Sequence, residues 1–248
     1  MYPSTLFHFT KQKTALFGIL VGNFKISYAR EAIVGSKERR VFHAPMVSFC
    51  DLRLAELIAH MGSYGEYGIG MSKKWATEKG LNPVAYWSSQ ARLIDNILKK
   101  LEHDYRDIME EFDEVKSKKK QEHYDDLIDI VRFIKNYEGR LERRDGEVVD
   151  PYRFADEREW RYVPKNEWVF PPFLSENADK HKWNQSINEQ LKFEPDDIRY
   201  IIVSNERERL EVINHIKYGT GKAKKYGDEA VIRLSSRILT AEQIRDDV

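Results

Sequence analysis

Two polar side chains share one face of a predicted strand near the start of the sequence. His8 and Thr10 lie two residues apart in the segment 6–10, and strand residues at this spacing point the same way. Phe7 and Phe9 alternate with them and are expected to face the core. An imidazole beside a hydroxyl suits a ribose diol or an amide. The alternative is an ordinary solvated strand face, which shows the same alternation.

A second candidate is the segment 64–70, in which Tyr64 and Tyr67 are interspersed with three glycines. Glycine lets a ligand approach the main chain, and aromatic faces can stack on a planar heterocycle. The alternative is a turn rich in tyrosine and glycine that precedes a strand, with its rings in the core.

A pair of carboxylates is the third candidate. Glu157 and Glu159 are two residues apart at the start of a predicted strand, so their carboxylates are expected to point the same way. One could orient a hydroxyl while the other stabilises a developing positive charge. The alternative is a charged strand edge on which Arg158 and Arg161 form ordinary surface ion pairs.

Other reactive residue types argue against several classes of chemistry. The seven histidines show no helical metal-binding spacing, and a single cysteine, Cys50, cannot form a zinc cluster or an intrachain disulfide. Cys50 ends an apolar run and is expected to be a small buried side chain. No G-x-G-x-x-G or Walker sequence is present, which disfavours the usual dinucleotide and triphosphate folds. Because neither the histidines nor Cys50 shows the spacing of a metal site, we expect no metal in the site.

The composition indicates a globular chain. Its 248 residues carry 41 Lys and Arg against 41 Asp and Glu, and 5 Trp, 13 Tyr and 12 Phe argue against disorder. A formal charge of zero disfavours a dedicated duplex-DNA binder. No segment approaches the ~20 apolar residues of a membrane helix, and no signal-peptide core follows the first residues. The expected compartment is the cytoplasm, with no membrane partner.

Short apolar runs bounded by Gly, Pro and Ser predict strands, and helical spacing predicts helices between them. The predicted strands are 6–10, 46–50, 67–71, 84–87, 160–163, 200–204 and 230–234. The predicted helices are 14–21, 52–61 and 207–216, and Thr240 is expected to cap a further helix. This irregular alternation favours an α+β fold over a doubly wound parallel sheet.

The segment 89–143 has a different pattern. Apolar residues recur at the 3.6-residue period from Leu93 to Phe112 and again from Tyr124 to Tyr137, with charged residues between them. This predicts two antiparallel helices that project from the core, joined by a turn whose lysines, Lys118 to Lys120, are exposed. Such a hairpin could be a solvent-facing insertion or an arm that binds a partner.

In this order, the three candidate clusters resemble known families. The strand 6–10 with the segment 16–22 resembles the opening of ADP-ribosyltransferase-like domains of the DarT type, where an H-x-T strand precedes a short helix. The segments 45–51, 67–70 and 82–86 resemble AbiGi-type abortive-infection proteins, which are bacterial phage-resistance proteins described as the antitoxin half of a two-gene system. The segment 157–161, EREWR, is similar to elements of both groups.

The resemblance to ADP-ribosyltransferases implies a mixed or antiparallel split sheet in one domain, 1–248, with the segment 89–143 inserted as a helical hairpin. It implies NAD as substrate, cleaved through an oxocarbenium-like state, and no metal. The residues that the resemblance assigns to NAD binding are His8, Thr10, Ser48, Tyr64 and Tyr67. It assigns catalysis to Glu159, which would hold the ribose 2′-hydroxyl and steady the cation, and to Glu157, which would orient the acceptor.

Two functions follow from these resemblances. In the first, the protein is a phage-defence toxin that transfers ADP-ribose from NAD to a cellular macromolecule, with nucleic acid among the candidate acceptors. In the second, it is a catalytically silent antitoxin that neutralises a partner toxin. The set of His8, Tyr67 and Glu159 favours the first, whereas the AbiGi likeness, the neutral charge and the hairpin favour the second. The sequence leads us to expect the first, with a cognate toxin or antitoxin as the partner.

Overall fold

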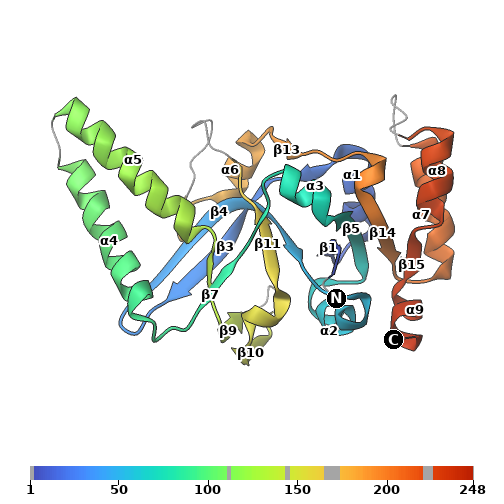
Figure 1. Ribbon diagram of the computed structural model, residues 1–248, viewed down its shortest axis with the longest axis horizontal. Coiled ribbons are helices and arrows are strands. Elements are labelled where there is room, and N and C mark those ends of the chain that lie inside the picture. Colours follow the sequence, from blue (N-terminus) through green and yellow to red (C-terminus); the bar gives the residue numbers. More distant parts are fainter. Residues whose placement is uncertain (1–2, 111–112, 143–145, 165–173, 220–225, 248) are drawn as a thin grey trace.

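A nine-stranded sheet forms the centre of the computed structural model, which describes residues 3–110, 113–142, 146–164, 174–219 and 226–247. Seven strands follow the order β15–β14–β5–β1–β4–β11–β6, and β3 and β12 also pair with β4 (Figure 1). The strands of this sheet are β1 (Thr5–Thr10), β3 (Ser27–Val34), β4 (Arg39–Cys50), β5 (Tyr67–Ser72), β6 (Asn82–Pro83), β11 (Glu159–Tyr162), β12 (Leu174–Ser175), β14 (Ile198–Val203) and β15 (Ile238–Thr240).

Three two-stranded pairs lie outside this sheet. They are β2 (Phe24–Lys25) with β13 (Gln190–Leu191), β7 (Ala85–Trp87) with β8 (Ile134–Asn136), and β9 (Gly139–Glu142) with β10 (Val148–Tyr152). The helices are α1 (Lys13–Gly22), α2 (Leu57–Tyr64), α3 (Lys73–Glu78), α4 (Arg92–Met109), α5 (Glu114–Val131), α6 (Lys180–Ser186), α7 (Glu206–Tyr218), α8 (Asp228–Ser235) and α9 (Ala241–Asp246). Three 3-10 turns, η1 (Leu54–Glu56), η2 (Phe154–Glu157) and η3 (Pro195–Asp197), precede α2, β11 and β14.

The central sheet is mostly antiparallel. Among the strands that the structure describes, only β14 and β15 run parallel to one another in it, and the other pairs are antiparallel. The mixed α+β fold expected from the sequence is therefore confirmed. The pattern does not by itself show an ADP-ribosyltransferase sheet.

The long strand β4 joins two parts of the sheet. Its first eight residues pair with β3, from Arg39 opposite Val34 to Met46 opposite Ser27. Its last residues pair with β11 on one side and with β1 on the other, so that Cys50 lies opposite both Phe7 and Glu159. This register brings β1 and β11 to either side of the same short stretch of β4.

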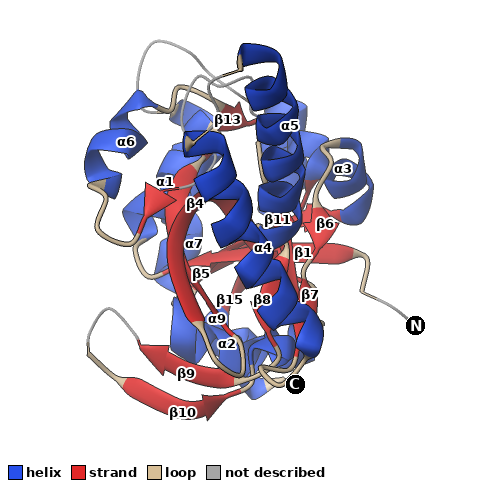
Figure 2. Cartoon of the chain, turned by 90° about the vertical axis from the view of Figure 1, so that its left-hand side faces the viewer, coloured by secondary structure: helices blue, strands red, loops and turns tan. Residues whose placement is uncertain are grey.

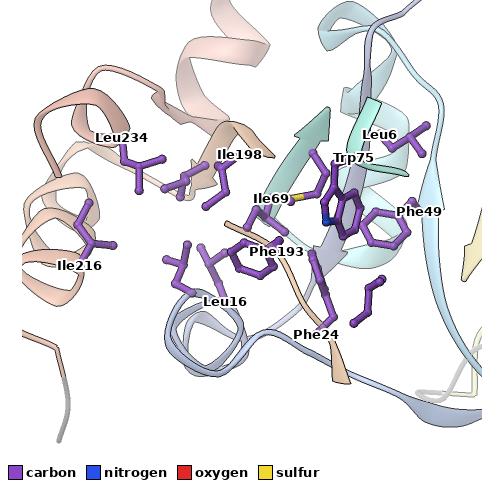
Figure 3. Packing of buried hydrophobic residues seen from close by; sticks show 14 of the residues in the cluster. Leu6, Leu16, Phe24, Phe49, Ile69, Trp75, Phe193, Ile198, Ile216 and Leu234 are labelled. Carbon is purple, nitrogen blue, oxygen red and sulfur yellow. The ribbon is translucent and has the colours of Figure 1, made fainter. Parts of the chain in front are cut away.

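Helices cover both faces of the sheet and bury its apolar side chains. On one face, residues of α1, α3, α7 and α8 pack around a cluster that includes Phe24, Phe49 and Trp75 (Figure 3). On the other face, α2 and α9 cover Phe7, Cys50 and their neighbours. Burying this apolar area contributes about 25 cal/mol per Å2, which makes the two layers the main source of stability. Cys50 is buried, as its apolar context predicts.

The predicted hairpin is present as α4 and α5, which project from one end of the molecule (Figures 1 and 2). Ile94, Leu98, Ile128 and Val131 at its base pack against side chains of β3 and β4. Lys118 and Lys119 are exposed as expected, whereas Lys120 is half-buried and donates to the carbonyl oxygen of Asp107. All three lysines lie within α5, because this helix begins at Glu114. The turn between the helices therefore precedes the lysine run.

Other sequence predictions were wrong in specific places. The second helix ends at Val131, and Ile134 lies in strand β8, since it pairs with Ala85 of β7 instead of continuing the apolar stripe. The segment 230–234 is helical and not a strand, because α8 begins at Asp228 and buries Val231 and Leu234 on one face. Strand β3 was missed. Pro171 and Pro172, a pair that indicates a loop, lie outside the described residues. Thr240 caps α9 with a capping box as predicted.

No described helix combines the length and the apolar character that a membrane crossing requires.

The glycines of β5 make room for aromatic rings. A Cβ atom on Gly70 would lie 2.8 Å from the ring of Phe7 and 2.9 Å from the methyl group of Thr5, and one on Gly68 would lie 2.7 Å from the ring of Phe9. The β1–β5 register places Phe7 opposite Gly70 and Phe9 opposite Gly68. The glycines therefore allow close packing of β1 on β5, whereas the sequence suggested that they let a ligand approach.

Substitution of Gly70 by alanine is expected to destabilise the fold by about 1–3 kcal/mol, because Phe7 and Thr5 are buried and cannot yield without strain. Gly62→Ala is the matched control. Its Cβ would meet nothing within 4 Å on the exposed side of α2, so it should stabilise the fold by about 0.5–1 kcal/mol. Urea unfolding of both variants measures the difference, and equal effects would contradict the packing role.

Candidate functional site

A polar cavity of about 230 Å3 lies where β1, β4, α2 and the start of β11 meet. Its lining residues are Phe7, His8, Phe9, Glu31, Ser48, Phe49, Cys50, His60, Tyr64, Lys135, Glu157 and Glu159. Five of the seven site residues predicted from the sequence are among them: His8, Ser48, Tyr64, Glu157 and Glu159. The roles assigned to these five residues stay predictions.

Glu159, the first residue of β11, is only 6% exposed and accepts four hydrogen bonds from the chain itself. Oε1 accepts from Ser48 Oγ at 2.6 Å and from Arg161 Nε at 2.8 Å, and Oε2 accepts from Arg161 Nη2 at 3.0 Å and from Lys135 Nζ at 3.1 Å. Burial alone would raise the pKa of Glu159. The adjacent cations of Arg161 and Lys135 outweigh that effect and hold its pKa well below the usual range.

Lys135 bridges the two carboxylates. Its ammonium lies 2.8 Å from Glu157 Oε2 and 3.1 Å from Glu159 Oε2, and 5.0 Å from the centre of the Phe154 ring. Burial acts to lower the pKa of Lys135, but the two carboxylates act more strongly and raise it above its usual value. Lys135, whose side chain exposes 15% of its surface, is therefore a cation in the site. Strand β8 brings it there from a segment that the sequence predicted to be helical.

Glu157 reaches the same ammonium from a different element. It ends η2 and does not lie on a strand as predicted. Arg158, which follows, adopts the left-handed conformation with φ of 43°, a conformation that non-glycine residues adopt only at some cost. This turn directs both Glu157 and Glu159 toward Lys135. Their convergence thus depends on a backbone reversal and not on strand alternation.

Two tyrosines fix the other side of Glu157. The hydroxyls of Tyr64 and Tyr152 both donate to Glu157 Oε1, the second at 3.0 Å. With Lys135 on Oε2, three of roughly four acceptor positions of this carboxylate are filled. Burial, and then the charge of Glu157, raise the pKa of Tyr64, so that it stays a protonated donor.

Two neutral imidazoles border the cavity. His8 Nδ1 lies 2.8 Å from the carbonyl oxygen of Ser48, which can only accept, so Nδ1 carries the proton. Burial lowers the pKa of His8 despite this hydrogen bond. His60 stacks on Tyr64 with ring centres 4.4 Å apart, and burial lowers its pKa to about 4. Both rings are therefore uncharged near neutral pH.

Thr10 and Tyr67 do not line the cavity, contrary to the sequence-based prediction. They pair with one another at one end of β1 and β5, where Thr10 Oγ1 accepts from the amide of Gln12. The hydroxyl of Tyr67 donates to Glu208 of α7. Thr10 shares a strand face with His8, but two residues along a strand span about 7 Å, which takes it beyond the cavity.

Four residues important to this site were missed or misread from the sequence: Glu31, Lys135, Tyr152 and Arg161. The sequence offered Arg161 only as a surface residue in the alternative interpretation, yet it is fully buried and donates to Glu159, to Glu31 and to the carbonyl oxygen of Arg132. Its position two residues after Glu159 on one strand could have indicated this pairing. Nothing in the local sequence indicates Lys135 or Glu31, because distant segments bring them here.

A second cavity, of about 490 Å3, adjoins the first and shares His60 and Glu157 with it. Its other walls come from α2, from Leu52 and Glu56 before that helix, and from residues between 151 and 158. The guanidinium of Arg158 pairs with both oxygens of Glu56 at its rim, at 3.1 and 2.8 Å. Among the described residues, no group of three or more His, Cys, Asp or Glu side chains is placed to hold a metal ion.

Comparison with known proteins shows the family to which this chain belongs. Residues 23–204 match the family model described as "Putative abortive phage resistance protein AbiGi, antitoxin". The chain belongs to the AbiGi family. A curated member of the family, the abortive phage resistance protein AbiGi of Lactococcus lactis subsp. cremoris, is 28% identical over 226 residues, which cover 83% of this chain and 89% of the relative. No solved structure matches the chain.

The AbiGi match covers most of the charged network but not all of the cavity. Ser48, Lys135, Glu157 and Glu159 lie within residues 23–204, whereas His8 and the helices α7 to α9 lie outside this range. The AbiGi resemblance stated from the sequence is therefore confirmed. An ADP-ribosyltransferase domain has no comparable support from these comparisons.

Removing the bridging cation of this AbiGi-family chain should be costly. Lys135→Met would leave two buried carboxylates facing one another, and we expect a loss of about 3–5 kcal/mol in the free energy of unfolding. Lys100→Met is the control, since the Lys100 side chain is 47% exposed and its ammonium lies 3.1 Å from Asp104. Its loss should change stability by less than about 0.5 kcal/mol. Chemical denaturation compares the two variants, and similar midpoints would contradict the bridging role.

His60 should make stability depend on pH. In the unfolded chain its pKa is about 6.5, and in the folded chain it is about 4. Between these values the unfolded state binds more protons, so stability rises with pH and is lost as pH falls from 6.5 toward 4. His60→Phe should reduce the loss between pH 7 and pH 5 by about 1–2 kcal/mol, whereas His181→Phe, at an exposed position, should not. Unfolding curves at the two pH values measure the free energy of unfolding. If His60→Phe lost as much stability between pH 7 and pH 5 as the unmodified chain, His60 would not be the group responsible.

Proposed function

We propose that this AbiGi-family chain acts in abortive phage defence as an antitoxin, an interaction protein that binds and neutralises a companion toxin. In this proposal the polar cavity does not turn over NAD. The observation that carries the proposal is the closed coordination of Glu159, whose two oxygens accept four hydrogen bonds from Ser48, Arg161 and Lys135. The description of the family as an antitoxin supports the same conclusion.

The chemistry of NAD cleavage explains why this coordination matters. A carboxylate stabilises an oxocarbenium-like state by placing negative charge beside the reacting carbon and by accepting from the ribose hydroxyl. The charge of Glu159 is already compensated by two buried cations, and its acceptor positions are filled. To serve as a catalyst it would have to break an ion pair in a site shielded from water, which costs several kcal/mol.

The size of the cavity also favours recognition. At about 230 Å3 it is smaller than the roughly 300–1,000 Å3 typical of pockets that enclose a drug-sized ligand. Tyr67, which the resemblance assigns to NAD binding, lies outside it and donates to Glu208. A dinucleotide would therefore also have to use the adjoining second cavity.

A second candidate is an ADP-ribosyltransferase that uses NAD as substrate, with a cellular macromolecule such as a nucleic acid as acceptor. The convergence of His8, Ser48, Tyr64, Glu157 and Glu159 on one cavity favours it, because the resemblance assigned these residues to NAD. In this candidate, binding of NAD would have to displace Lys135 or Arg161 from Glu159. The chain would then be the toxin of the pair.

Growth and NAD cleavage distinguish the two candidates. We expect the chain, expressed together with the protein encoded by the adjacent gene, to restore growth that this neighbour alone arrests, and to co-purify with it. The purified chain should release no nicotinamide from NAD+ in chromatographic assays, and calorimetry with NAD+ should show no binding.

Growth arrest by the chain alone, together with NAD+ cleavage, would reject the antitoxin proposal and support the transferase. That activity should then be lost in Glu159→Gln and kept in Glu189→Gln, which changes an exposed carboxylate bound to Tyr162. The comparison requires that the Glu159→Gln variant is folded, because Glu159 also compensates the charges of Lys135 and Arg161. Cooperative thermal melting of the variant shows this.

A further inference from the structure

The walls of the polar cavity carry unequal numbers of opposite charges. Three carboxylates, Glu31, Glu157 and Glu159, surround two cations, Lys135 and Arg161. These five side chains expose between 0% and 15% of their surface. The formal balance is therefore one negative charge. A buried charge without a counter-ion is unfavourable, so the cavity favours a cationic occupant.

The positions of the unfilled acceptors show where such a cation would bind. Glu31 accepts from Arg161 through Oε2 at 2.8 Å, and its Oε1 has no partner in the described part of the chain. Glu157 keeps one acceptor position beyond those taken by its two tyrosines and Lys135. The four hydrogen bonds that Glu159 accepts, in contrast, fill all the acceptor positions of its carboxylate. The occupant would therefore bind Glu31 and Glu157.

The two histidines add acceptors and no charge. Because His8 Nδ1 donates to Ser48, its Nε2 is an acceptor. Neither ring nitrogen of His60 has a hydrogen-bond partner among the residues that the structure describes, and a neutral imidazole offers one acceptor nitrogen. Both rings line the cavity. An occupant with several hydrogen-bond donors would satisfy them together with the carboxylates.

The aromatic walls favour a flat cation. His60 stacks on Tyr64 and makes an edge-to-face contact with Phe9, with ring centres 5.5 Å apart. Phe49 lines the wall beside His8. A guanidinium group is planar, carries five donors, pairs with carboxylates and stacks on aromatic faces, whereas an ammonium group is a compact and strongly hydrated charge. The cavity is large enough for one such head group.

We propose that this cavity receives the guanidinium group of an arginine presented by the companion toxin, which Glu31 and Glu157 bind and the rings around His60 enclose. The identity of the partner rests on the antitoxin function proposed above. The cation preference of the cavity rests on its own charges and can be tested without the partner. A pyridinium cation, such as the nicotinamide ring of NAD+, is the competing occupant.

The probe for this test is ethylguanidinium, with ethylurea as its neutral counterpart of the same shape. Binding is followed through the ring proton signals of His8 and His60 in NMR spectra of the full chain. We expect ethylguanidinium to shift both signals in a saturable way and ethylurea to leave them unchanged. Equal responses to the two compounds would overturn the proposal.

Variants then identify the carboxylate responsible. Glu31→Gln removes the unbalanced charge and keeps an oxygen that accepts from Arg161, so it should weaken ethylguanidinium binding at least tenfold. Glu176→Gln is the matched control, because Glu176 pairs with Arg30 on the neighbouring position of β3 and is 52% exposed. Undiminished binding by a folded Glu31→Gln would overturn the proposal. The comparison of the two probes on the unmodified chain stays decisive if this variant does not fold.

Two further measurements separate this proposal from the proposed function. If 1-methylnicotinamide shifts the His8 and His60 signals in a saturable way and ethylguanidinium does not, the arginine proposal is overturned and the occupant is a pyridinium cation. Equal capture of the companion toxin by Glu31→Gln and by the unmodified chain would overturn the proposal and leave the antitoxin function in place. Failure of the unmodified chain to rescue growth, with ethylguanidinium still bound, would overturn the antitoxin function and leave the guanidinium preference of the cavity.

Discussion

The ammonium of Lys135 between the carboxylates of Glu157 and Glu159 is the interaction on which the arrangement of the cavity depends. None of these charges could be buried alone, because an unpaired ion in the interior costs several kcal/mol. Arg161 extends the network to Glu31 of β3 and to the carbonyl oxygen of Arg132 at the end of α5. The network therefore ties β3, β8, β11 and the base of the hairpin together at positions that apolar packing alone would leave free to shift.

The apolar layers supply the frame within which this network can form. Strand β4 pairs with β3 along its first part and with β1 and β11 along its last part, so it holds Glu159 of β11 beside His8 of β1. The close approach of β1 to β5, allowed by Gly68 and Gly70, fixes the strand that carries His8. Packing sets the positions of the backbone, and the charges then select one arrangement of side chains.

Local patterns in the sequence predicted the elements whose apolar period is strong. They gave β1, β5, β11, the two long helices, and five residues that do line one cavity. They failed where long-range contacts decide the structure: Ile134 fits a helical stripe but pairs with β7, and Lys135 enters the site only because of that pairing. Likewise, the run 230–234 is apolar enough for a strand, but the residues before it start a helix. The contacts of Arg161 with the carboxylate of Glu31 and with the carbonyl oxygen of Arg132 were equally invisible, since both partners are distant in sequence.

Catalysis and recognition place different demands on a buried carboxylate. A group that stabilises a cationic transition state must hold uncommitted charge at the reacting atom before the reaction begins. Glu159 does not, because two cations and a hydroxyl already occupy it. Recognition needs only an unbalanced charge at the wall of the cavity and acceptors to direct the partner, and Glu31 and Glu157 provide both. In the function that we propose, two of the three carboxylates therefore neutralise Lys135 and Arg161 and stabilise the fold. The one negative charge that these cations do not balance is what a partner would recognise.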